Sequence, residues 1–290
     1  MGRYLGQHFL INKDKVRKIV EALGLKDGDV IIEIGPGHGE LTKELVNKFI
    51  SLKINKFKII AIEKDKKLVE ILRNKMALPY REAPCPDKAI VGVVGAVEVI
   101  EGDALRILSK ITNDLQLTTN DYKIVGNIPY YITGYLLRIL GELEHKPSLI
   151  VLTIQKEVAE RVCAKVGKMN LLAASVQFWA KPEIVDFISK KDFKPMPKVD
   201  SAIIRLAIRV QPLATRENAD KYYQFIRILF KQPRKTISNN LLVVCCNAKY
   251  ANTRECREEI IKKLRKLGID PQARPQDLSI EQIKELLTLF

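Results

Sequence analysis

The sequence has few residues of the kinds that bind metals or form covalent cross-links. Among its 290 residues are three His and five Cys, and no two Cys are spaced as C-x-x-C. Structural zinc sites need closely spaced groups of these residues, and small disulfide-stabilised folds are rich in Cys. The sequence therefore predicts no metal site and no disulfide framework, which fits a reducing compartment.

Long apolar runs are missing as well. A helix that spans a bilayer needs about 20 consecutive apolar residues, and no stretch of the chain approaches that length. The N-terminal residues MGRYLGQHFL lack the apolar core and the cleavage signal of a signal peptide. We therefore expect a cytoplasmic protein that does not bind membranes.

Positive charge is what the sequence has in excess. It has 49 Lys and Arg against 34 Asp and Glu, which gives a net charge of +15 and a pI of about 9.5. Residues 205–290 contribute 17 basic and 9 acidic side chains, or +8 of that total. A basic excess of this size favours a polyanionic partner such as nucleic acid, although a lysine-rich solvated surface would give the same number.

The first two-thirds of the chain alternates apolar runs with amphipathic segments. Near-continuous Ile and Val predict strands that are buried on both faces of a parallel sheet. Between them, stripes such as Leu41, Leu45 and Phe49 predict helices. This alternation predicts a doubly wound, Rossmann-like α/β domain. The predicted strands are residues 29–35, 57–63, 97–103, 121–127 and 148–154.

The pattern changes near residue 210. Beyond it we predict no strand, two helical stripes follow, and Ser279 with Gln282 forms a capping-box signal for a last helix. We therefore expect a larger α/β domain over residues 1–210 and a smaller all-α C-terminal domain over residues 211–290.

A glycine-rich segment, Glu33-Ile-Gly-Pro-Gly-His-Gly39, lies between the first predicted strand and the helix after it. Gly35, Gly37 and Gly39 let the backbone turn sharply and approach a ligand closely. A dinucleotide fingerprint would need its third glycine where the chain has Glu40, so a nicotinamide dehydrogenase is disfavoured. The spacing G-x-G-x-G is typical of enzymes that bind S-adenosylmethionine (SAM), although such a loop also occurs as a plain turn.

Two acidic residues end the next two predicted strands. Glu63 follows Gly39 by 24 residues, where a carboxylate can accept hydrogen bonds from the ribose hydroxyls of a nucleoside. Asp103 ends the third strand, where it can accept a hydrogen bond from an adenine amino group. Either acid alone would be an ordinary strand-end carboxylate, but two of them beside the glycine loop favour SAM.

Asn127-Ile128-Pro129-Tyr130 ends the fourth predicted strand, where open α/β sheets place their reactive groups. The exocyclic amine of adenine is a poor nucleophile because its lone pair is delocalised into the ring. Asn127 and the Ile128 carbonyl can accept its two hydrogens and favour a tetrahedral nitrogen, while Pro129 fixes the backbone. Tyr130 offers a flat face for a base taken out of its stack. The segment therefore favours an adenine N6-methyltransferase, although it would also make a serviceable turn.

These motifs together resemble those of the small-subunit ribosomal RNA adenine N6-dimethyltransferases, relatives of the macrolide-resistance methyltransferases. The resemblance covers nearly the whole chain, and GQHFL with GPGHG is more similar to the archaeal and eukaryotic branch than to the bacterial one. It departs at residues 74–97, which look like an insertion in a crossover connection. The matching segments are Gly6–Leu10, 33–39 (EIGPGHG), Glu63, 101–105 (EGDAL), 127–130 (NIPY), 155–162 (QKEVAERV), 193–201 (FKPMPKVDS), 234–241 (RKTISNNL) and 274–279 (RPQDLS).

The resemblance implies a SAM pocket, a site for the target base and no metal. The residues implied to bind SAM are His8, Leu10, Gly35, Gly37, Glu63, Asp103, Ala104 and Asn127. The resemblance also implies that Phe193 would close over the target adenine. The residues implied to be catalytic are Asn127, Ile128, Pro129, Tyr130 and Phe193. The basic excess near the C-terminus separately predicts RNA phosphate contacts by Lys231, Arg234 and Lys235.

By this resemblance, residues 1–210 form the SAM-binding catalytic domain and residues 211–290 the RNA-binding domain. The expected reaction is N6-dimethylation of two adjacent adenosines near the 3′ end of small-subunit rRNA, on a 30S-type pre-ribosomal particle, by a monomer that acts in ribosome biogenesis. Two alternatives stay open: a ribosome-assembly factor whose catalysis is dispensable, and a DNA adenine N6-methyltransferase. The intact NIPY segment argues against the first, and the family-like C-terminal segments argue against the second.

Overall fold

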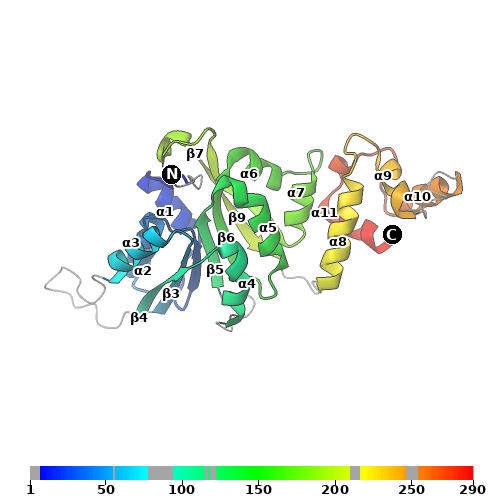
Figure 1. Cartoon of the computed structure of the whole chain (residues 1–290). Helices are drawn as coiled ribbons and strands as arrows, with labels where there is room; N and C mark the ends of the chain where they lie inside the picture. Colours follow the sequence, from blue (N-terminus) through cyan, green and yellow to red (C-terminus); the bar gives the residue numbers. More distant parts are fainter. Residues whose placement is uncertain are drawn as a thin grey trace. The chain divides into compact units, whose positions relative to one another are not determined.

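The computed structural model describes residues 7–54, 56–77, 94–114, 117, 122–209, 216–245 and 254–289 (Figure 1). The chain divides into two compact units, which we call the first and the second unit. The first contains Met1–Ala159 and Pro182–Ile208, and the second contains Glu160–Lys181 and Arg209–Phe290. The second unit thus includes a segment from inside the predicted domain 1–210. The division into domains 1–210 and 211–290, with their assigned roles, stays a prediction.

The first unit is built on a seven-stranded sheet with the strand order β4-β3-β2-β5-β6-β9-β7. Strands β2 to β6 are parallel, and β9 runs antiparallel to β6. The five predicted strands and the doubly wound α/β class are confirmed. The strands are β2 (Val30–Ile34), β3 (Lys56–Glu63), β4 (Val94–Glu101), β5 (Tyr122–Asn127), β6 (Leu149–Gln155), β7 (Ala180–Ile188) and β9 (Ser201–Ile208).

The last two strands of the sheet, β7 and β9, were not predicted. β7 lies at the sheet edge, where alternate side chains such as Glu183 and Phe187 are exposed. It therefore lacks the unbroken apolar run that identifies the central strands. An edge strand with one solvated face needs no such run.

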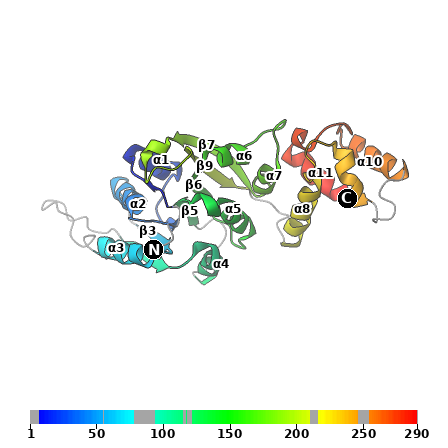
Figure 2. The ribbon, with the colours of Figure 1, turned by 45° about the horizontal axis from the view of Figure 1, so that its top comes forward.

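Helices cover both faces of the sheet. Helices α1 and α2 pack on one face, where Ile19, Leu45 and Phe49 form a buried cluster with Ile31 and Val125 of the sheet. Figures 1 and 2 show α4 and α5 on the opposite face. This double cover buries both sides of β2 and explains its continuous apolar sequence. The helices are α1 (Lys13–Ala22), α2 (Glu40–Ser51), α3 (Lys66–Ala77), α4 (Ala104–Asp114), η1 (Tyr130–Ile132), α5 (Thr133–Glu142) and η2 (Lys190–Asp192).

The described residues of the C-terminal part of the chain, 216–245 and 254–289, are mainly helical, as predicted. Buried Tyr222 stacks on Phe178 with ring centroids 4.0 Å apart, and its hydroxyl donates a hydrogen bond to the Ala174 carbonyl. These contacts explain why Glu160–Lys181 packs with the C-terminal helices. The helices are α6 (Lys156–Val162), which begins in the first unit, and α7 (Leu171–Gln177), α8 (Arg216–Leu229), α9 (Ile237–Cys245), α10 (Arg254–Lys266), η3 (Pro275–Asp277) and α11 (Ile280–Leu289).

The capping box before α11 is confirmed. The Gln282 N–H donates to the Ser279 hydroxyl oxygen at 3.1 Å, and the Ser279 N–H donates to the Gln282 side-chain oxygen at 2.9 Å. Two of the N–H groups that the start of the helix leaves without helical partners are thereby satisfied.

A disulfide involves one of the described Cys residues, whereas the sequence predicts no disulfide framework. Cys256 of α10 is disulfide-bonded. A disulfide needs only two Cys that the fold brings close together, and the spacing of Cys along the sequence does not reveal this.

Among the described helices, none combines the length and the apolar character that a membrane crossing requires. Most of the expected insertion, residues 78–93, lies outside the described residues.

Candidate active site

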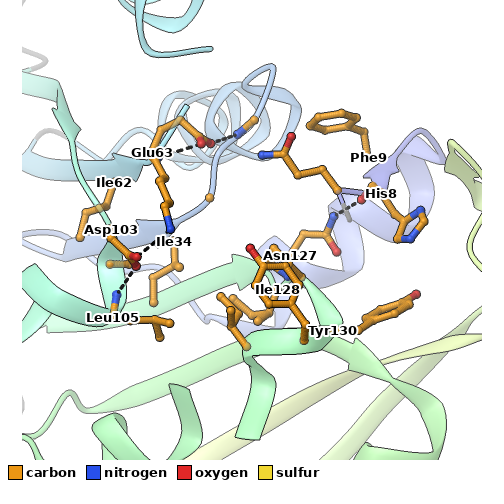
Figure 3. Close-up of a pocket in the computed structure, with 18 of the residues that line it drawn as sticks. His8, Phe9, Ile34, Ile62, Glu63, Asp103, Leu105, Asn127, Ile128 and Tyr130 are labelled. Carbon is orange, nitrogen blue, oxygen red and sulfur yellow. Dashed lines mark hydrogen bonds and ion pairs between the residues drawn. The ribbon is translucent and has the colours of Figure 1, made fainter. Parts of the chain in front are cut away.

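The carboxyl ends of the parallel strands meet at one edge of the sheet and surround a pocket (Figure 3). The glycine loop follows β2, Glu63 ends β3, Asp103 follows β4 and Asn127 ends β5. The strand order reverses between β2 and β5, and open α/β sheets bind their ligands at such a point. Every predicted site residue of the first unit except Leu10 lines this pocket.

The glycine loop is pressed between two neighbours. A Cβ at Gly37, which has a φ of +59°, would lie 2.8 Å from the Phe9 ring. A Cβ at Gly39, which has a φ of +89°, would lie 2.6 Å from Leu72 of α3. Both positive φ and lack of space therefore require glycine at these positions.

Glu63 ties the end of β3 to the glycine loop. Its side chain is almost fully buried. Oε1 accepts hydrogen bonds from the N–H groups of Lys64 and Asp65 at 2.8 and 2.9 Å, and Oε2 accepts one from Gly37 at 3.1 Å. A carboxylate has about four acceptor positions, so Oε2 has room for one more donor, such as a ligand hydroxyl.

Asp103 is held by two donors. The Lys64 ammonium lies 2.9 Å from Oδ2, and the Leu105 N–H donates to Oδ1 at 3.1 Å. Burial acts to raise the pKa of Asp103, but the hydrogen bonds from Lys64 and Leu105 outweigh it and lower the pKa. Asp103 is therefore an anion of fixed orientation that can accept a hydrogen bond from an amino group.

The Asn127 side chain is oriented by the N-terminal segment. Its Nδ2 donates to the backbone carbonyl of His8 at 2.8 Å, as Figure 3 shows. Because a carbonyl can only accept, this bond identifies the amide nitrogen and leaves Oδ1 as an acceptor. His8 is held in turn, since its ring Nδ1 lies 2.8 Å from the Pro195 carbonyl oxygen.

Tyr130 presents an uncharged aromatic ring beside Asn127. Its hydroxyl lies 2.8 Å from the Ser201 hydroxyl, and its ring centroid lies 5.6 Å from that of His8. Burial raises the pKa of Tyr130, so the side chain is a neutral phenol at physiological pH. Its useful feature is the ring face, on which a planar base can stack.

A short pair of strands contributes aromatic residues to the pocket. β1 (Phe9–Leu10) pairs antiparallel with β8 (Phe193–Lys194). Phe193 is buried and lines the pocket, as does Phe9. Leu10 pairs with Phe193 and lies with it and Ile19 in the same buried cluster. Leu10 is not among the residues that line the pocket, and the implied contact between Leu10 and SAM stays a prediction.

The pocket also contains residues that the motifs did not single out. Gln7 and Phe9 lie in the N-terminal GQHFL segment, Lys64 directly follows Glu63, and Tyr131 directly follows the NIPY segment. The available signal for Gln7 and Phe9 was their place inside the GQHFL segment, and for Lys64 and Tyr131 it was adjacency to a motif residue. The contact of Phe9 with the glycine loop and the ion pair of Lys64 join residues far apart in sequence, which no local pattern reveals.

The three cations predicted to bind RNA lie in the second unit. Lys231, Arg234 and Lys235 are all exposed on the loop between α8 and α9. Asn240, which is buried beneath this loop, accepts a hydrogen bond from the Gln232 N–H and donates one to the Gln232 carbonyl, both at 3.1 Å. The loop backbone that carries the cations is therefore fixed to α9.

A sequence model of the family described as "Ribosomal RNA adenine dimethylase" matches residues 2–268. The chain belongs to this family. The "Ribosomal RNA small subunit methyltransferase A" of Caldanaerobacter subterraneus is 34% identical over 283 residues, which cover 97% of this chain and 94% of the relative. The protein of the same name from Lactobacillus acidophilus is 36% identical over 287 residues, which cover 97% and 88%.

Solved structures share the fold over nearly the whole chain. A dimethyladenosine transferase from Plasmodium falciparum has a TM-score of 0.74 and 25% identity, and covers 98% of this chain and 97% of that chain. The 23S rRNA methyltransferase ErmE has a TM-score of 0.68 and 24% identity, and covers 97% and 98%. The resemblance is thus confirmed at the level of the dimethylase family. The curated relatives named above are bacterial, and the archaeal and eukaryotic branch stays a prediction.

As a member of the dimethylase family, the chain is a SAM-dependent methyltransferase, and its pocket fits SAM. Glu63 offers an acceptor to a ribose hydroxyl, and Asp103 offers an anionic acceptor to an amino group. Ile34 and Ile62 add apolar walls. This combination suits a nucleoside that carries hydroxyls at one end and an exocyclic amine at the other.

Glu33, the acidic residue of the glycine motif, is completely buried next to this site. The Thr42 hydroxyl donates to its Oε2 at 2.7 Å, whereas no donor among the described residues reaches Oε1. Burial raises the pKa of Glu33 to about 8. In the folded protein the carboxyl group is therefore protonated at neutral pH, while in the unfolded chain it is ionised.

We expect this difference to make stability depend on pH. An acid whose pKa is raised by folding stabilises the folded state fully below its unfolded pKa, and this contribution is lost as the pH rises toward about 8. Between pH 5 and pH 8, the wild type should lose more than about 1 kcal/mol of unfolding free energy relative to Glu33→Gln. Urea denaturation at both pH values measures this. The exposed control Glu21→Gln should follow the wild type, and parallel profiles for wild type and Glu33→Gln would contradict the prediction.

Proposed function

We propose that this chain transfers methyl groups from SAM to N6 of two adjacent adenosines near the 3′ end of small-subunit rRNA. The names of the curated relatives and the family support the substrate class. The observation that carries the proposal is the Asn127 amide, whose nitrogen is occupied by the His8 carbonyl so that Oδ1 is available to an amine. We further propose that the protein acts as a cytoplasmic monomer on a 30S-type particle.

The chain contributes alignment and hydrogen bonding to this reaction. When bound, SAM supplies a methyl group on a positively charged sulfur. Asn127 Oδ1 and the Ile128 carbonyl accept hydrogen bonds from the adenine N6 and favour a tetrahedral nitrogen with an available lone pair. Pro129 fixes the backbone beside that carbonyl, while Tyr130 and Phe193 hold the base. The transfer would break the bond between the methyl group and sulfur and leave neutral S-adenosylhomocysteine, while N6 would lose a proton to water, so the site needs no strong base.

The alternative of an assembly factor with dispensable catalysis is disfavoured by the fixed orientation of the polar side chains in this pocket. A protein that only binds RNA has no need for an amide oriented by a hydrogen bond across the pocket or for anionic side chains held by fixed donors. The DNA alternative is disfavoured by the family match, which extends from residue 2 to residue 268 and so includes most of the second unit. RNA methylation is therefore the function that we propose.

Loss of the Glu63 carboxylate should weaken SAM binding. A charged hydrogen bond contributes about 1.5–3 kcal/mol, so Glu63→Ala should bind SAM at least about tenfold more weakly. Titration calorimetry with S-adenosylhomocysteine and with its 2′-deoxy and 3′-deoxy analogues measures this. The wild type should discriminate against at least one of these analogues, and Glu63→Ala should not. An unchanged affinity in Glu63→Ala would remove this residue from the cofactor site.

Tyr130 variants test the function itself. Stacking of a base on an aromatic ring contributes about 1–3 kcal/mol, so Tyr130→Ala should lower kcat/KM by about fivefold to 150-fold while SAM affinity stays the same. Tyr130→Phe, which loses only the bond to Ser201, should retain most activity. The assay follows labelled methyl groups from SAM into unmethylated small-subunit particles, with duplex DNA as the competing substrate. Transfer to DNA alone, or full activity of Tyr130→Ala, would contradict the proposal.

We also propose that the loop with Lys231, Arg234 and Lys235 contacts RNA phosphates. The three cations are exposed together on a loop fixed by Asn240, and the C-terminal part of the chain carries more than half of the net charge. Removal of residues 209–290 would be a poor test, because it would also take Tyr222 away from Phe178. Neutralisation of single charges avoids this problem.

Arg234→Gln with Lys235→Gln should weaken binding to small-subunit particles and flatten its salt dependence. Each lost phosphate contact lowers the slope of log K against log salt concentration by about 0.7–0.9. The matched control is Arg265→Gln with Lys266→Gln, which removes the same charge from exposed positions of α10. Filter binding over a salt series should show a change of slope only for the loop pair. Equal effects of both pairs would mean that net charge alone matters.

A further inference from the structure

The outer face of α5 carries aromatic side chains next to the pocket. Tyr131 is 65% exposed and Tyr135 is 56% exposed. They are four residues apart at the junction of η1 and α5, so they project from the same side of adjoining helical turns. The opposite side of α5 buries Leu136, Leu137 and Leu140 in the core. The helix is therefore amphipathic, with tyrosines where solvated helices carry charged residues.

This aromatic surface continues the pocket. Tyr131 lines the pocket, and Tyr135 and Arg138 extend the same stripe at positions i+4 and i+7. The Arg138 side chain is 60% exposed and pairs with Glu142 at 2.8 Å. At a rise of about 1.5 Å per residue, the stripe runs roughly 10 Å along the helix from the mouth of the pocket.

The surface beside the aromatic stripe is open at Gly134. Gly134 is exposed, and a Cβ built on it would have no atom within 4 Å apart from its chain neighbours and the backbone of its own helix. A ligand can therefore lie flat across this part of the helix. Single exposed apolar residues are common on proteins, but two neighbouring aromatics next to an open position at the rim of a pocket indicate a binding surface.

We propose that Tyr131, Tyr135 and Arg138 form a platform for unpaired RNA nucleotides that flank the target adenosine. Bases stack on exposed aromatic rings without regard to sequence, and cations beside them contact phosphates. Two features favour RNA over a protein partner: the stripe begins at Tyr131, which lines the pocket, and the chain has a net charge of +15. The inference rests on the proposed function and extends it to the neighbours of the methylated base.

Tyr135 is the residue for the test, because Tyr131 also lines the pocket. The probe is a fluorescein-labelled, single-stranded 10-nucleotide RNA, and its affinity is measured by fluorescence anisotropy with saturating S-adenosylhomocysteine. Tyr135→Leu keeps apolar area but removes the aromatic face, and should bind the probe about fivefold to 150-fold more weakly. Tyr135→Phe keeps the face and should bind within about twofold of the wild type.

Two substitutions at Gly134, to Ala and to Glu, give a second test and should leave the fold intact. Gly134 has an ordinary helical backbone, so Ala or Glu at this position should favour the helix. Glu also suits the first turn of a helix. Gly134→Ala should leave the affinity for the probe nearly unchanged. Gly134→Glu fills the open position with a negative charge and should weaken binding more than fivefold.

A control at another exposed aromatic residue makes the result specific. Phe187→Leu on β7 removes a 45% exposed ring from the same unit and should not change binding of the probe. A blunt-ended RNA duplex of the same length should bind Tyr135→Leu and the wild type equally. Equal binding of the single strand by Tyr135→Leu and wild type would overturn the platform, and so would equal losses in Phe187→Leu.

Methyl transfer to small-subunit particles separates this proposal from the proposed function. If the wild type methylates particles and Tyr135→Leu binds the single strand normally, the platform is wrong and the proposed function stands. If the wild type methylates no particle, the proposed function fails, while the anisotropy data still decide whether the surface binds RNA. A Tyr135→Leu variant that binds particles weakly but the single strand normally would indicate a protein partner and would overturn the platform.

Discussion

The arrangement of the pocket depends on one hydrogen bond, from the Asn127 amide to the backbone carbonyl of His8. It joins the end of a central strand to a segment that lies 119 residues earlier in the chain. It fixes which atom of the amide faces the pocket, and it holds the N-terminal segment in place so that Phe9 packs on the glycine loop. The pairing of β1 with β8 then brings Phe193 to the same pocket. The walls on the substrate side of the pocket therefore depend on this bond.

The parts of the site that follow from strand order could be predicted from the sequence. Glu63, Asp103 and Asn127 are strand-end residues, and parallel strands bring such residues to one edge whatever the details of packing. Leu10 shows where this reasoning ends. Its motif suggests the pocket, but Leu10 packs in a core cluster with Ile19 and Phe193, and no periodicity of the sequence encodes this long-range packing. The ion pair of Lys64 with Asp103 and the inclusion of Glu160–Lys181 in the second unit are likewise long-range contacts.

Charge is distributed in a way that suits two different ligands. The pocket contains the carboxylates Glu63 and Asp103, both held by donors, although the chain as a whole carries +15. Acidic groups in the pocket match the hydroxyl and amino donors of a nucleoside, whereas surface cations match phosphates. The neutral phenol of Tyr130 and the neutral amide of Asn127 lie in the same pocket, where on the proposed function the uncharged base would lie. The charge of each group thus fits the part of the substrate that we assign to it.

The proposed dimethylation makes unequal demands on this rigid site. In the first transfer the adenine amine has two hydrogens, one for Asn127 Oδ1 and one for the Ile128 carbonyl. In the second transfer only one N–H remains, so one acceptor loses its partner, and a desolvated acceptor without a partner costs about 1–3 kcal/mol. Because the amide is fixed by His8 and the carbonyl by Pro129, neither group can turn to compensate. The first methyl group must therefore replace a hydrogen at one of the two acceptors, and apolar contacts such as those of Phe193 are the means by which the site can offset that loss.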